Sequence, residues 1–244
     1  MIKAVFVDFW KTLVAPRVSE DEYFAFRAKC LAEALMEFGY TFDFNRVLSA
    51  HKSSRRICDA VRESYFIEVP LDLELKVFLS LLDVYERGQN FMASLRNAYM
   101  RPLFNLTSTV DGAYSFLKNV RGMGFMVGLI SNVYTDLEVF DVLKRYGLYN
   151  LFDSMILSYI VGFRKPKPEI FKFALNSLHV NPDEAVMVGD DYNADIMGAL
   201  NIGMKAIWFT NDHSVEYPFK ADNFNSILNI IVNFSRNHHS LPPS

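Results

Sequence analysis

The sequence predicts an α/β fold, a Rossmann-like doubly wound parallel sheet into which an all-helical cap domain is inserted. Short runs rich in Val, Ile and Phe alternate with helical patterns from about Asp111 onward, which is typical of a parallel sheet covered by helices on both faces. Residues 16–103, by contrast, show helical periodicity and no convincing strand. Because a connection of that length cannot be a plain loop in a compact domain, it predicts an inserted helical domain.

The predicted strands are five apolar runs bounded by polar or turn residues: residues 2–7, 125–130, 155–157, 185–188 and 205–209. Between them, helical patterns cover residues 113–120, 136–146, 169–178 and 194–200. Gly147 and Gly203 stand where C-terminal helix caps belong. In the inserted segment, helical patterns cover residues 21–38, 44–65 and 71–99, the last broken near Gly88. Residues 225–234 predict a short apolar helix or strand at the sheet edge.

These elements divide the chain into three parts. We expect an α/β core of residues 1–15 and 104–236, a helical cap of residues 16–103 and a polar tail of residues 237–244. Pro16 and Pro102 lie at the two expected hinges. The tail contains His238 and His239, but a disordered chain end does not preorganise metal ligands.

Composition excludes several classes of protein. The chain has 244 residues and 51% hydrophobic content, enough for a substantial core. Its net charge of -3 gives no general attraction for nucleic acid or an anionic membrane. Cys30 and Cys58 have neither zinc-site spacing nor a disulfide pattern, which favours a reducing cytoplasm. Asp8 interrupts the first apolar run, so we expect no signal peptide, and no later stretch approaches the roughly 20 apolar residues of a membrane span. A small molecule is the expected partner, and the oligomeric state is left open between monomer and homodimer.

The candidate site residues follow the predicted strands at their carboxyl ends, where a doubly wound sheet binds its ligand. They comprise a candidate nucleophile, neutral hydrogen-bond donors, a cation and a group of carboxylates, which are the parts needed to transfer a phosphoryl group. In strand order they are Asp8, Trp10 and Thr12; Ser131 and Asn132; Gly162, Lys165 and Pro166; and Gly189, Asp190, Asp191 and Asp195.

Each type of side chain has a physical role in that chemistry. The Ser131 hydroxyl and the amides after Asp8 could hold phosphate oxygens, and Lys165 could neutralise one oxygen and keep the Asp8 carboxylate ionised. Asp190, Asp8 and a backbone carbonyl could form the incomplete oxygen cage that suits Mg²⁺. Without such an ion, the carboxylates at positions 8, 190 and 191 would repel a phosphate.

Four stretches, in this order, resemble the haloacid dehalogenase-like (HAD) hydrolase superfamily, in its branch with a helical cap after the first motif: residues 5–13, 128–132, 162–171 (GFRKPKPEIF) and 188–204 (VGDDYNADIMGALNIGM). The resemblance implies that Asp8 is a nucleophile forming an aspartyl intermediate. It implies catalytic roles for Thr12, Ser131 and Lys165, and substrate contacts for Trp10 and Asn132. The implied Mg²⁺ ligands are Asp8, the Trp10 backbone carbonyl, Asp190 and Asp191, with Asp195 acting indirectly on the metal.

Trp10 departs from the pattern of the family's phosphatases. Those enzymes usually carry a second Asp at this position, two residues after the nucleophile, to protonate the leaving group. An indole cannot exchange a proton near neutral pH, so this route to general acid catalysis is absent.

The departure leaves three interpretations open. The chain could be a Mg²⁺-dependent phosphatase of a small phosphorylated metabolite, with a phosphonate-cleaving enzyme as a variant that would need a cap lysine such as Lys52. It could be a 2-haloacid dehalogenase, although the acidic fourth motif counts against this. It could instead be a degenerate module that binds a phosphorylated ligand or a partner protein.

In the cap, Glu22, Tyr23 and Arg27 resemble a dehalogenase arginine helix, but a solvated helix face explains them equally well, and His51 is expected at a helix surface.

Overall fold

The computed structural model describes residues 1–85, 88–212 and 214–236, so the predicted tail and His213 lie outside the described residues. In those ranges no helix combines the length and the apolar character that crossing a membrane requires. The chain forms two compact units. Of the described residues, one unit contains those in 1–15, in 109–133 and from Leu143 onward, and the other contains those in 16–108 and 134–142. We call them the core and the cap.

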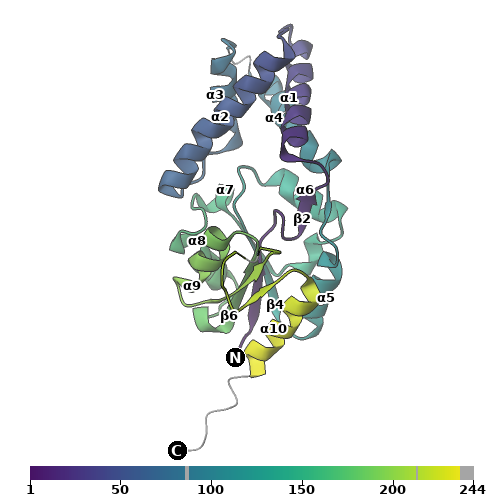
Figure 1. Cartoon of the computed structure of the whole chain (residues 1–244). Helices are drawn as coiled ribbons and strands as arrows, with labels where there is room; N and C mark the ends of the chain where they lie inside the picture. Colours follow the sequence, from purple (N-terminus) through teal and green to yellow (C-terminus); the bar gives the residue numbers. More distant parts are fainter. Residues whose placement is uncertain (86–87, 213, 237–244) are drawn as a thin grey trace, which may run out of the picture. The chain divides into compact units, whose positions relative to one another are not determined.

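The core is built on the predicted parallel sheet (Figure 1), which confirms the fold class. Its strand order is β5-β4-β1-β6-β7-β8, with β1 in the middle. From β1, strands β4 and β5 follow on one side and strands β6, β7 and β8 on the other, so the direction in which the sheet is built reverses at β1. The strands are β1 (Ala4–Val7), β4 (Met126–Ser131), β5 (Ser154–Leu157), β6 (Ala185–Gly189), β7 (Lys205–Phe209) and β8 (Lys220–Ala221). Val7 of β1 is in register with Leu129 of β4 and Val188 of β6. The residues that follow β1, β4 and β6 therefore meet at the switch point of the sheet, where such folds bind ligands.

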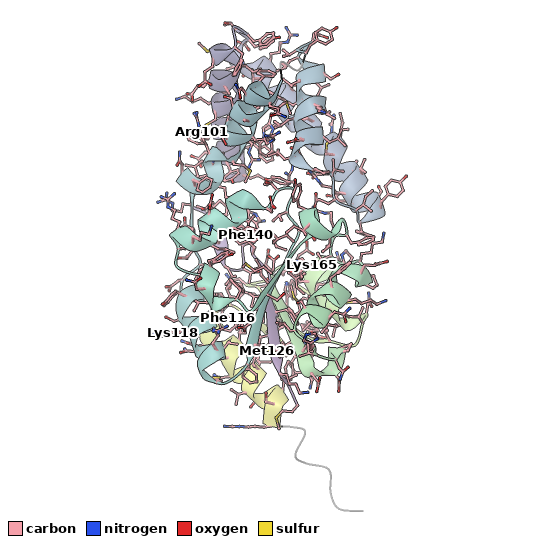
Figure 2. The ribbon with its side chains drawn as sticks, turned by 180° about the vertical axis from the view of Figure 1, so that it is seen from behind. Arg101, Phe116, Lys118, Met126, Phe140 and Lys165 are labelled. Atoms are coloured by element: carbon pink, nitrogen blue, oxygen red, sulfur yellow. The ribbon has the colours of Figure 1, made fainter. Side chains whose placement is uncertain are left out.

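The helices of the core are α5 (Ala113–Gly122), α7 (Ser158–Val161), α8 (Pro168–Ser177), α9 (Gly198–Leu200) and α10 (Phe224–Arg236). A π-helical turn, η3 (Tyr192–Met197), precedes α9, where the sequence predicts a single helix. Short 3-10 turns, η1 (Tyr149–Leu151) and η2 (Pro182–Glu184), precede β5 and β6. The segment predicted as helix or strand is helical in α10, and the strand at the sheet edge is β8. Phe116 of α5, labelled in Figure 2, stacks on Phe224 of α10.

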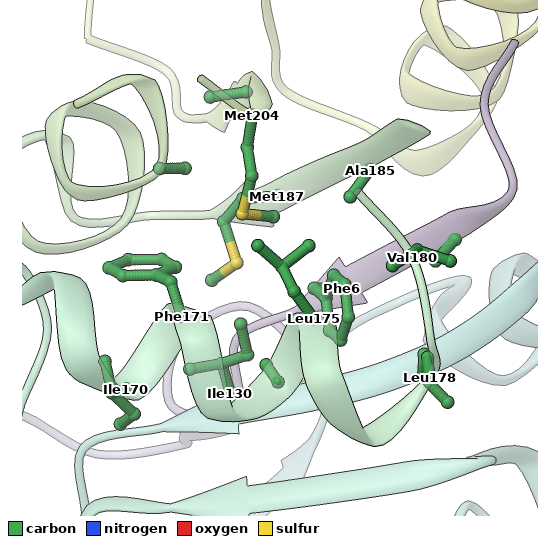
Figure 3. Packing of buried hydrophobic residues seen from close by; sticks show 14 of the residues in the cluster. Phe6, Ile130, Ile170, Phe171, Leu175, Leu178, Val180, Ala185, Met187 and Met204 are labelled. Atoms are coloured by element: carbon green, nitrogen blue, oxygen red, sulfur yellow. The ribbon is translucent and has the colours of Figure 1, made fainter. Parts of the chain in front are cut away.

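One apolar layer fixes the sheet against α8. Phe6 of β1, Ile130 of β4 and Met187 of β6 belong to the same buried cluster as Phe171 and Leu175 of α8 (Figure 3). A Cβ atom added at Gly128 would lie 2.3 Å from the Phe6 ring, so only glycine lets that ring cross the neighbouring strand.

In the described part of residues 16–108, the cap helices are α1 (Glu20–Glu37), α2 (Phe44–Tyr65), α3 (Leu71–Leu81) and α4 (Gln89–Asn105). Ser19 and Glu22 form a capping box that starts α1, and Asp43 caps α2. The sequence boundary at residue 103 falls inside α4, which continues past Pro102. Two short strands, β2 (Val14–Pro16) and β3 (Thr107–Thr109), pair in a separate sheet that the sequence pattern does not indicate.

The segment Tyr134–Val142 groups with the cap, although it follows core strand β4 in sequence. The Leu71 N–H donates a hydrogen bond to the Tyr134 carbonyl at 3.0 Å, and the Tyr134 ring meets the edge of Tyr99. Helix α6 (Leu137–Arg145) begins in this segment. Sequence periodicity finds the helix but not these contacts, which join residues far apart in the chain.

Candidate active site

Lys165 lies between two buried carboxylates in the core. Its Nζ is 2.5 Å from Asp8 Oδ1 and 2.6 Å from Asp195 Oδ1, and it also donates to the Ile130 carbonyl at 2.8 Å. Burial opposes the ammonium charge, but Asp195 and then Asp8 outweigh burial and raise the pKa of Lys165. The lysine is therefore a fixed cation beside the carboxylate of the candidate nucleophile.

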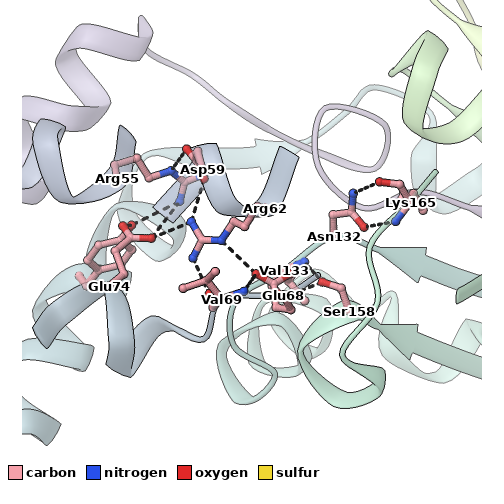
Figure 4. A network of polar contacts seen from close by, with 11 residues as sticks. Arg55, Asp59, Arg62, Glu68, Val69, Glu74, Asn132, Val133, Ser158 and Lys165 are labelled. Carbon is pink, nitrogen blue, oxygen red and sulfur yellow. Dashed lines mark hydrogen bonds and ion pairs between the residues drawn. The ribbon is translucent and has the colours of Figure 1, made fainter. Parts of the chain in front are cut away.

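Asn132 holds the backbone of Lys165. Its Nδ2 donates to the Lys165 carbonyl at 3.0 Å, and its Oδ1 accepts from the Lys165 N–H at 2.8 Å (Figure 4). Both polar ends of the Asn132 amide are thus used to tie the end of β4 to the loop that carries the cation. The substrate contact expected for Asn132 stays a prediction, whereas a positioning role is what its hydrogen bonds support.

Asp190 follows β6 and is held from two sides. Thr12 Oγ1 donates to its Oδ1 at 3.1 Å, and the indole Nε1 of Trp208 donates to its carbonyl at 2.8 Å. Burial and then the charge of Asp8 raise the pKa of Asp190 to about 6, with Lys165 opposing the rise. Trp208 lies at the end of β7, and a lone aromatic residue in an apolar run gives no sequence signal for this contact.

Asp191 and Asp195 have different surroundings from those that the sequence suggests. Asp191 is exposed and its Oδ1 accepts the N–H groups of Asn193 and Ala194, so it caps the π-helical turn η3. Asp195 is 1% exposed, and its Oδ2 accepts the Asp191 N–H at 3.1 Å. A Cβ atom at Gly189 would lie 2.2 Å from Asp195 Oδ2, so glycine at the end of β6 makes room for this carboxylate.

Asp8, Asp190 and Asp195 form one carboxylate group, whose candidate ligand oxygens all lie within 4.8 Å of one another. Among the described residues, the Lys165 ammonium pairs with two of these carboxylates, Asp8 and Asp195, and a third acidic group beside them fits a divalent cation with oxygen ligands. The three residues therefore fit a metal such as Mg²⁺. Asp195, expected to act indirectly, belongs to this group, and Asp191, expected as a ligand, does not.

Ser131 ends β4 and is 1% exposed. Its Oγ has no hydrogen-bond partner among the residues that the structure describes. A buried hydroxyl without a partner costs free energy unless a ligand uses it, so this atom is suited to hold a substrate oxygen. Trp10 lies in the tight loop after Asp8, bridged to Val14, and it offers no acidic side chain there.

Two of the cap candidates differ from expectation. Arg27 and His51 are buried, at 3% and 0% exposure, so neither lies on a solvated helix surface as the sequence pattern suggests. Glu22 serves the capping box of α1, and Lys52 forms an exposed ion pair with Asp21 at 2.9 Å. The helical pattern does not distinguish a buried polar face from a solvated one, because burial depends on which helices pack against it.

The burial of His51 leads to a prediction about pH. Burial, followed by the charges of Arg27, Arg55 and Lys52, holds the pKa of His51 well below its usual 6.5. The unfolded chain therefore binds a proton near pH 6.5 that the folded cap does not bind, and lowering the pH favours unfolding. We expect this residue to cost about 1.4 kcal/mol of stability between pH 7.5 and pH 5.5. Burial raises the pKa of Asp190 to about 6 and that of Asp195 to about 8, and these carboxylates act in the opposite direction over the same pH range. Urea titrations followed by circular dichroism should therefore show the effect as a difference: from pH 7.5 to pH 5.5, His51→Phe should gain about 1.4 kcal/mol relative to wild type, because the carboxylates are the same in both proteins.

The matched control is His179→Asn, at an exposed position with a left-handed backbone that Asn tolerates. Its free energy of unfolding should depend on pH as that of wild type does. A pH dependence in His51→Phe that is identical to that of wild type would contradict the assignment.

Comparison with known proteins agrees with this geometry. A family model described as haloacid dehalogenase-like hydrolase matches residues 2–203. A glyceraldehyde 3-phosphate phosphatase of Pyrococcus furiosus is 30% identical over 209 residues, covering 85% of this chain and 80% of the relative. A protein of the same name from Methanothermobacter thermautotrophicus is 39% identical but spans 47% of each chain.

Two solved structures share the fold. A HAD phosphatase from Thermococcus onnurineus has a TM-score of 0.66 at 22% identity, covering 94% of this chain and 98% of its own. A 2-haloacid dehalogenase from Pseudomonas syringae pv. Tomato has a TM-score of 0.70 at 20% identity, covering 96% of this chain and 100% of its own. At these identities both support the architecture alone. The family model covers most of the chain, and a relative 30% identical to it is matched over 80% of its length, so the protein belongs to the haloacid dehalogenase-like hydrolases.

Proposed function

We propose that the protein is a Mg²⁺-dependent phosphatase of a small phosphorylated metabolite that acts through an aspartyl intermediate on Asp8. The observation that carries this proposal is the carboxylate group of Asp8, Asp190 and Asp195 around Lys165. The names of the curated relatives, glyceraldehyde 3-phosphate phosphatases, support a small phosphorylated substrate. A cytoplasmic location and a monomeric or homodimeric state remain predictions from the sequence.

Each residue of the site has a separate role in the proposed reaction. A carboxylate oxygen of Asp8 attacks phosphorus in line, a P–O bond to Asp8 forms, and the ester P–O bond breaks with its electrons on the leaving oxygen. Lys165 fixes the other Asp8 oxygen, and Ser131 Oγ donates to an equatorial phosphate oxygen. Water then attacks phosphorus, releases inorganic phosphate and restores the Asp8 carboxylate.

Asp8 and Asp190 would hold the divalent cation, with the Trp10 carbonyl and Asp195 as further oxygen donors. When bound, that cation neutralises charge on the phosphate and on the carboxylates around it. Thr12 supports the site by donating to Asp190, and Trp208 by holding the Asp190 backbone. Asp191 is assigned to capping, because its carboxylate already accepts two backbone N–H groups.

The residue at position 10 bears on the choice of substrate. Trp10 cannot protonate a leaving oxygen, so the proposal favours esters whose alcohol leaves readily or takes a proton from its own substituents or from water. Dehalogenation needs no such proton. However, three clustered carboxylates would repel a 2-halo acid if no cation were bound. A phosphonate-cleaving activity would need a reactive cap amine, and Lys52 is instead an exposed ammonium paired with Asp21.

One assay separates these activities. Purified protein is tested on phosphate monoesters, phosphonoacetaldehyde and 2-chloropropionate, with Mg²⁺ or with EDTA, beside Asp190→Asn and Asp191→Asn. We expect phosphate release that requires Mg²⁺, falls at least about a hundredfold in Asp190→Asn and changes less than about threefold in Asp191→Asn, because Asn can still cap the turn.

The other outcomes contradict the proposal. Chloride release that EDTA does not affect would identify a dehalogenase, and turnover of phosphonoacetaldehyde alone would identify a phosphonatase. No turnover of any compound, with phosphate still raising the melting temperature, would identify a binding module. Equal losses of phosphate release in Asp190→Asn and Asp191→Asn would mean that Asp191 is also a metal ligand.

A further inference from the structure

Helices α2 and α3 of the cap pack against each other in antiparallel directions (Figure 1). Residues 66–70 join them, and Arg46 near the start of α2 donates to the Leu82 carbonyl at the end of α3. Arg62 of α2 and Glu74 of α3 meet at 2.8 Å on the buried side of this pair. Because both helices are right-handed and run in opposite directions, the residues immediately before these two lie together on the outer face of the pair.

On α2, the outer positions follow the spacing of a heptad repeat. Ser53, Ile57, Ala60 and Ser64 recur at alternating intervals of four and three residues, and Val61 lies beside them. Ile57 and Val61 are 46% and 37% exposed, Ala60 and Ser64 are exposed, and Ser53 is half-buried. Small and apolar side chains at this spacing allow a second helix to pack closely along the seam.

Helix α3 continues the same outer face with Leu73, Val77 and Leu81. The two leucines are 51% and 43% exposed, and Val77 is half-buried. We call these positions of α2 and α3 together the α2–α3 face; none of them carries a charge. The buried centre of a protein interface is likewise depleted of charged residues, and a contiguous exposed apolar patch marks an interaction surface.

Arg56 and Glu63 flank the α2–α3 face along the side of α2 that is turned toward α1. Both are exposed, and both line the groove between α1 and α2, so they stand at the edge of the face. Among the residues that the structure describes, neither has an ion-pair partner. The two residues are one heptad apart, so the same heptad position carries a cation at one end of the seam and an anion at the other.

We propose that the α2–α3 face joins two copies of this chain in a symmetric dimer, with α2 packed antiparallel on α2 of the partner subunit. A two-fold axis near Ala60 brings Arg56 of one copy opposite Glu63 of the partner subunit, and symmetry gives the same pair a second time. The uncharged seam is then buried beside two charge pairs at its rim. A second copy is the occupant because this charge pattern is complementary to itself.

The dissociation constant of the dimer tests the face. Sedimentation equilibrium of the full chain compares wild type with Ile57→Glu, which places a charge in the seam, and with Met36→Glu. Met36 is the matched control, since it is 60% exposed on α1 and lies outside the α2–α3 face. We expect wild type to dimerise with a Kd of about 10 μM or tighter, Ile57→Glu to raise the Kd at least about a hundredfold, and Met36→Glu to change it less than about threefold.

Charge reversal tests the antiparallel arrangement. Arg56→Glu and Glu63→Arg each place like charges opposite one another at both rim pairs, and each should raise the Kd about tenfold. The double variant exchanges the two charges and should return the Kd to within about threefold of wild type. Losses that add in the double variant would overturn the antiparallel pairing of α2.

The remaining outcomes are distinct. Wild type that stays monomeric at about 100 μM overturns the proposal, and so does a dimer that Ile57→Glu weakens no more than Met36→Glu does. If circular dichroism shows that Ile57→Glu is not folded, Ser64→Glu decides, because Ser64 is an exposed position of the same seam. None of these measurements uses activity, so the dimer and the proposed function succeed or fail separately.

Discussion

Replacing Asp8 by Asn should abolish phosphate release, by at least about a thousandfold in kcat, which corresponds to about 4 kcal/mol of barrier. An amide oxygen is a poor nucleophile and carries no charge for Lys165 or a cation to fix. Phosphate release measured over time, with Mg²⁺ and the best ester of the panel, gives the rate. Rapid acid quenching of wild type should trap a hydroxylamine-labile phosphate on the protein, which Asp8→Asn should not show.

The loss of phosphate release identifies Asp8 as the nucleophile only if the Asp8→Asn protein is folded. Asn is close in size to Asp, and losing one of three clustered carboxylates relieves repulsion while it removes one contact of Lys165. We therefore expect the melting temperature without metal to change by only a few degrees. A well-folded Asp8→Asn protein that releases phosphate at more than about a tenth of the wild-type rate would exclude Asp8 as the nucleophile.

The second large effect is on stability. Lys165→Met should lower the free energy of unfolding of the metal-free protein by about 3–5 kcal/mol, because it leaves Asp8 and Asp195 buried without their cation. That is a large fraction of the 5–15 kcal/mol that usually holds a domain folded. Urea titrations measure it, and intrinsic fluorescence is a suitable probe because Trp10 and Trp208 both lie in the core.

Two further variants separate the loss of the ion pair from the loss of a side chain. Lys167→Met removes a half-buried lysine two residues away, whose ammonium lies 5.0 Å from the Phe163 ring, and should cost less than about 1 kcal/mol. Adding Asp195→Asn to Lys165→Met should recover part of the loss, since one unpaired carboxylate is then gone. Strictly additive losses in the double variant would mean that Lys165 and Asp195 do not interact energetically.

Most of the fold follows from patterns that are local in the chain. Period-2 and uninterrupted apolar runs locate β1, β4, β5, β6 and β7 within a few residues, because a strand buried on both faces has no polar position. The helical repeat of apolar side chains locates the cap helices. What these patterns lack is any signal for short elements such as β2, β3 and α7, whose few residues do not complete a period.

The residues of the site could also be predicted, since residues after parallel strands must gather at one edge of the sheet. The sequence could not predict which atoms of each residue face the site. Asp191 and Asp195 are both acidic residues after β6, yet a backbone turn uses one as its cap and buries the other against Gly189. Asn132 looks like a ligand residue in sequence and is instead bonded twice to the backbone of Lys165.

By itself, the sequence determined the fold class, the inserted helices and the set of charged groups at the strand ends, because hydrophobic periodicity and the succession of strands and helices depend on neighbours along the chain. The tertiary structure alone decided how charge is balanced. Among the described residues, it paired Arg62 with Asp59, Glu68 and Glu74, and it placed Lys165 between Asp8 and Asp195. Pairing of buried charges depends on atoms brought together from distant parts of the chain, and desolvation makes that pairing decisive.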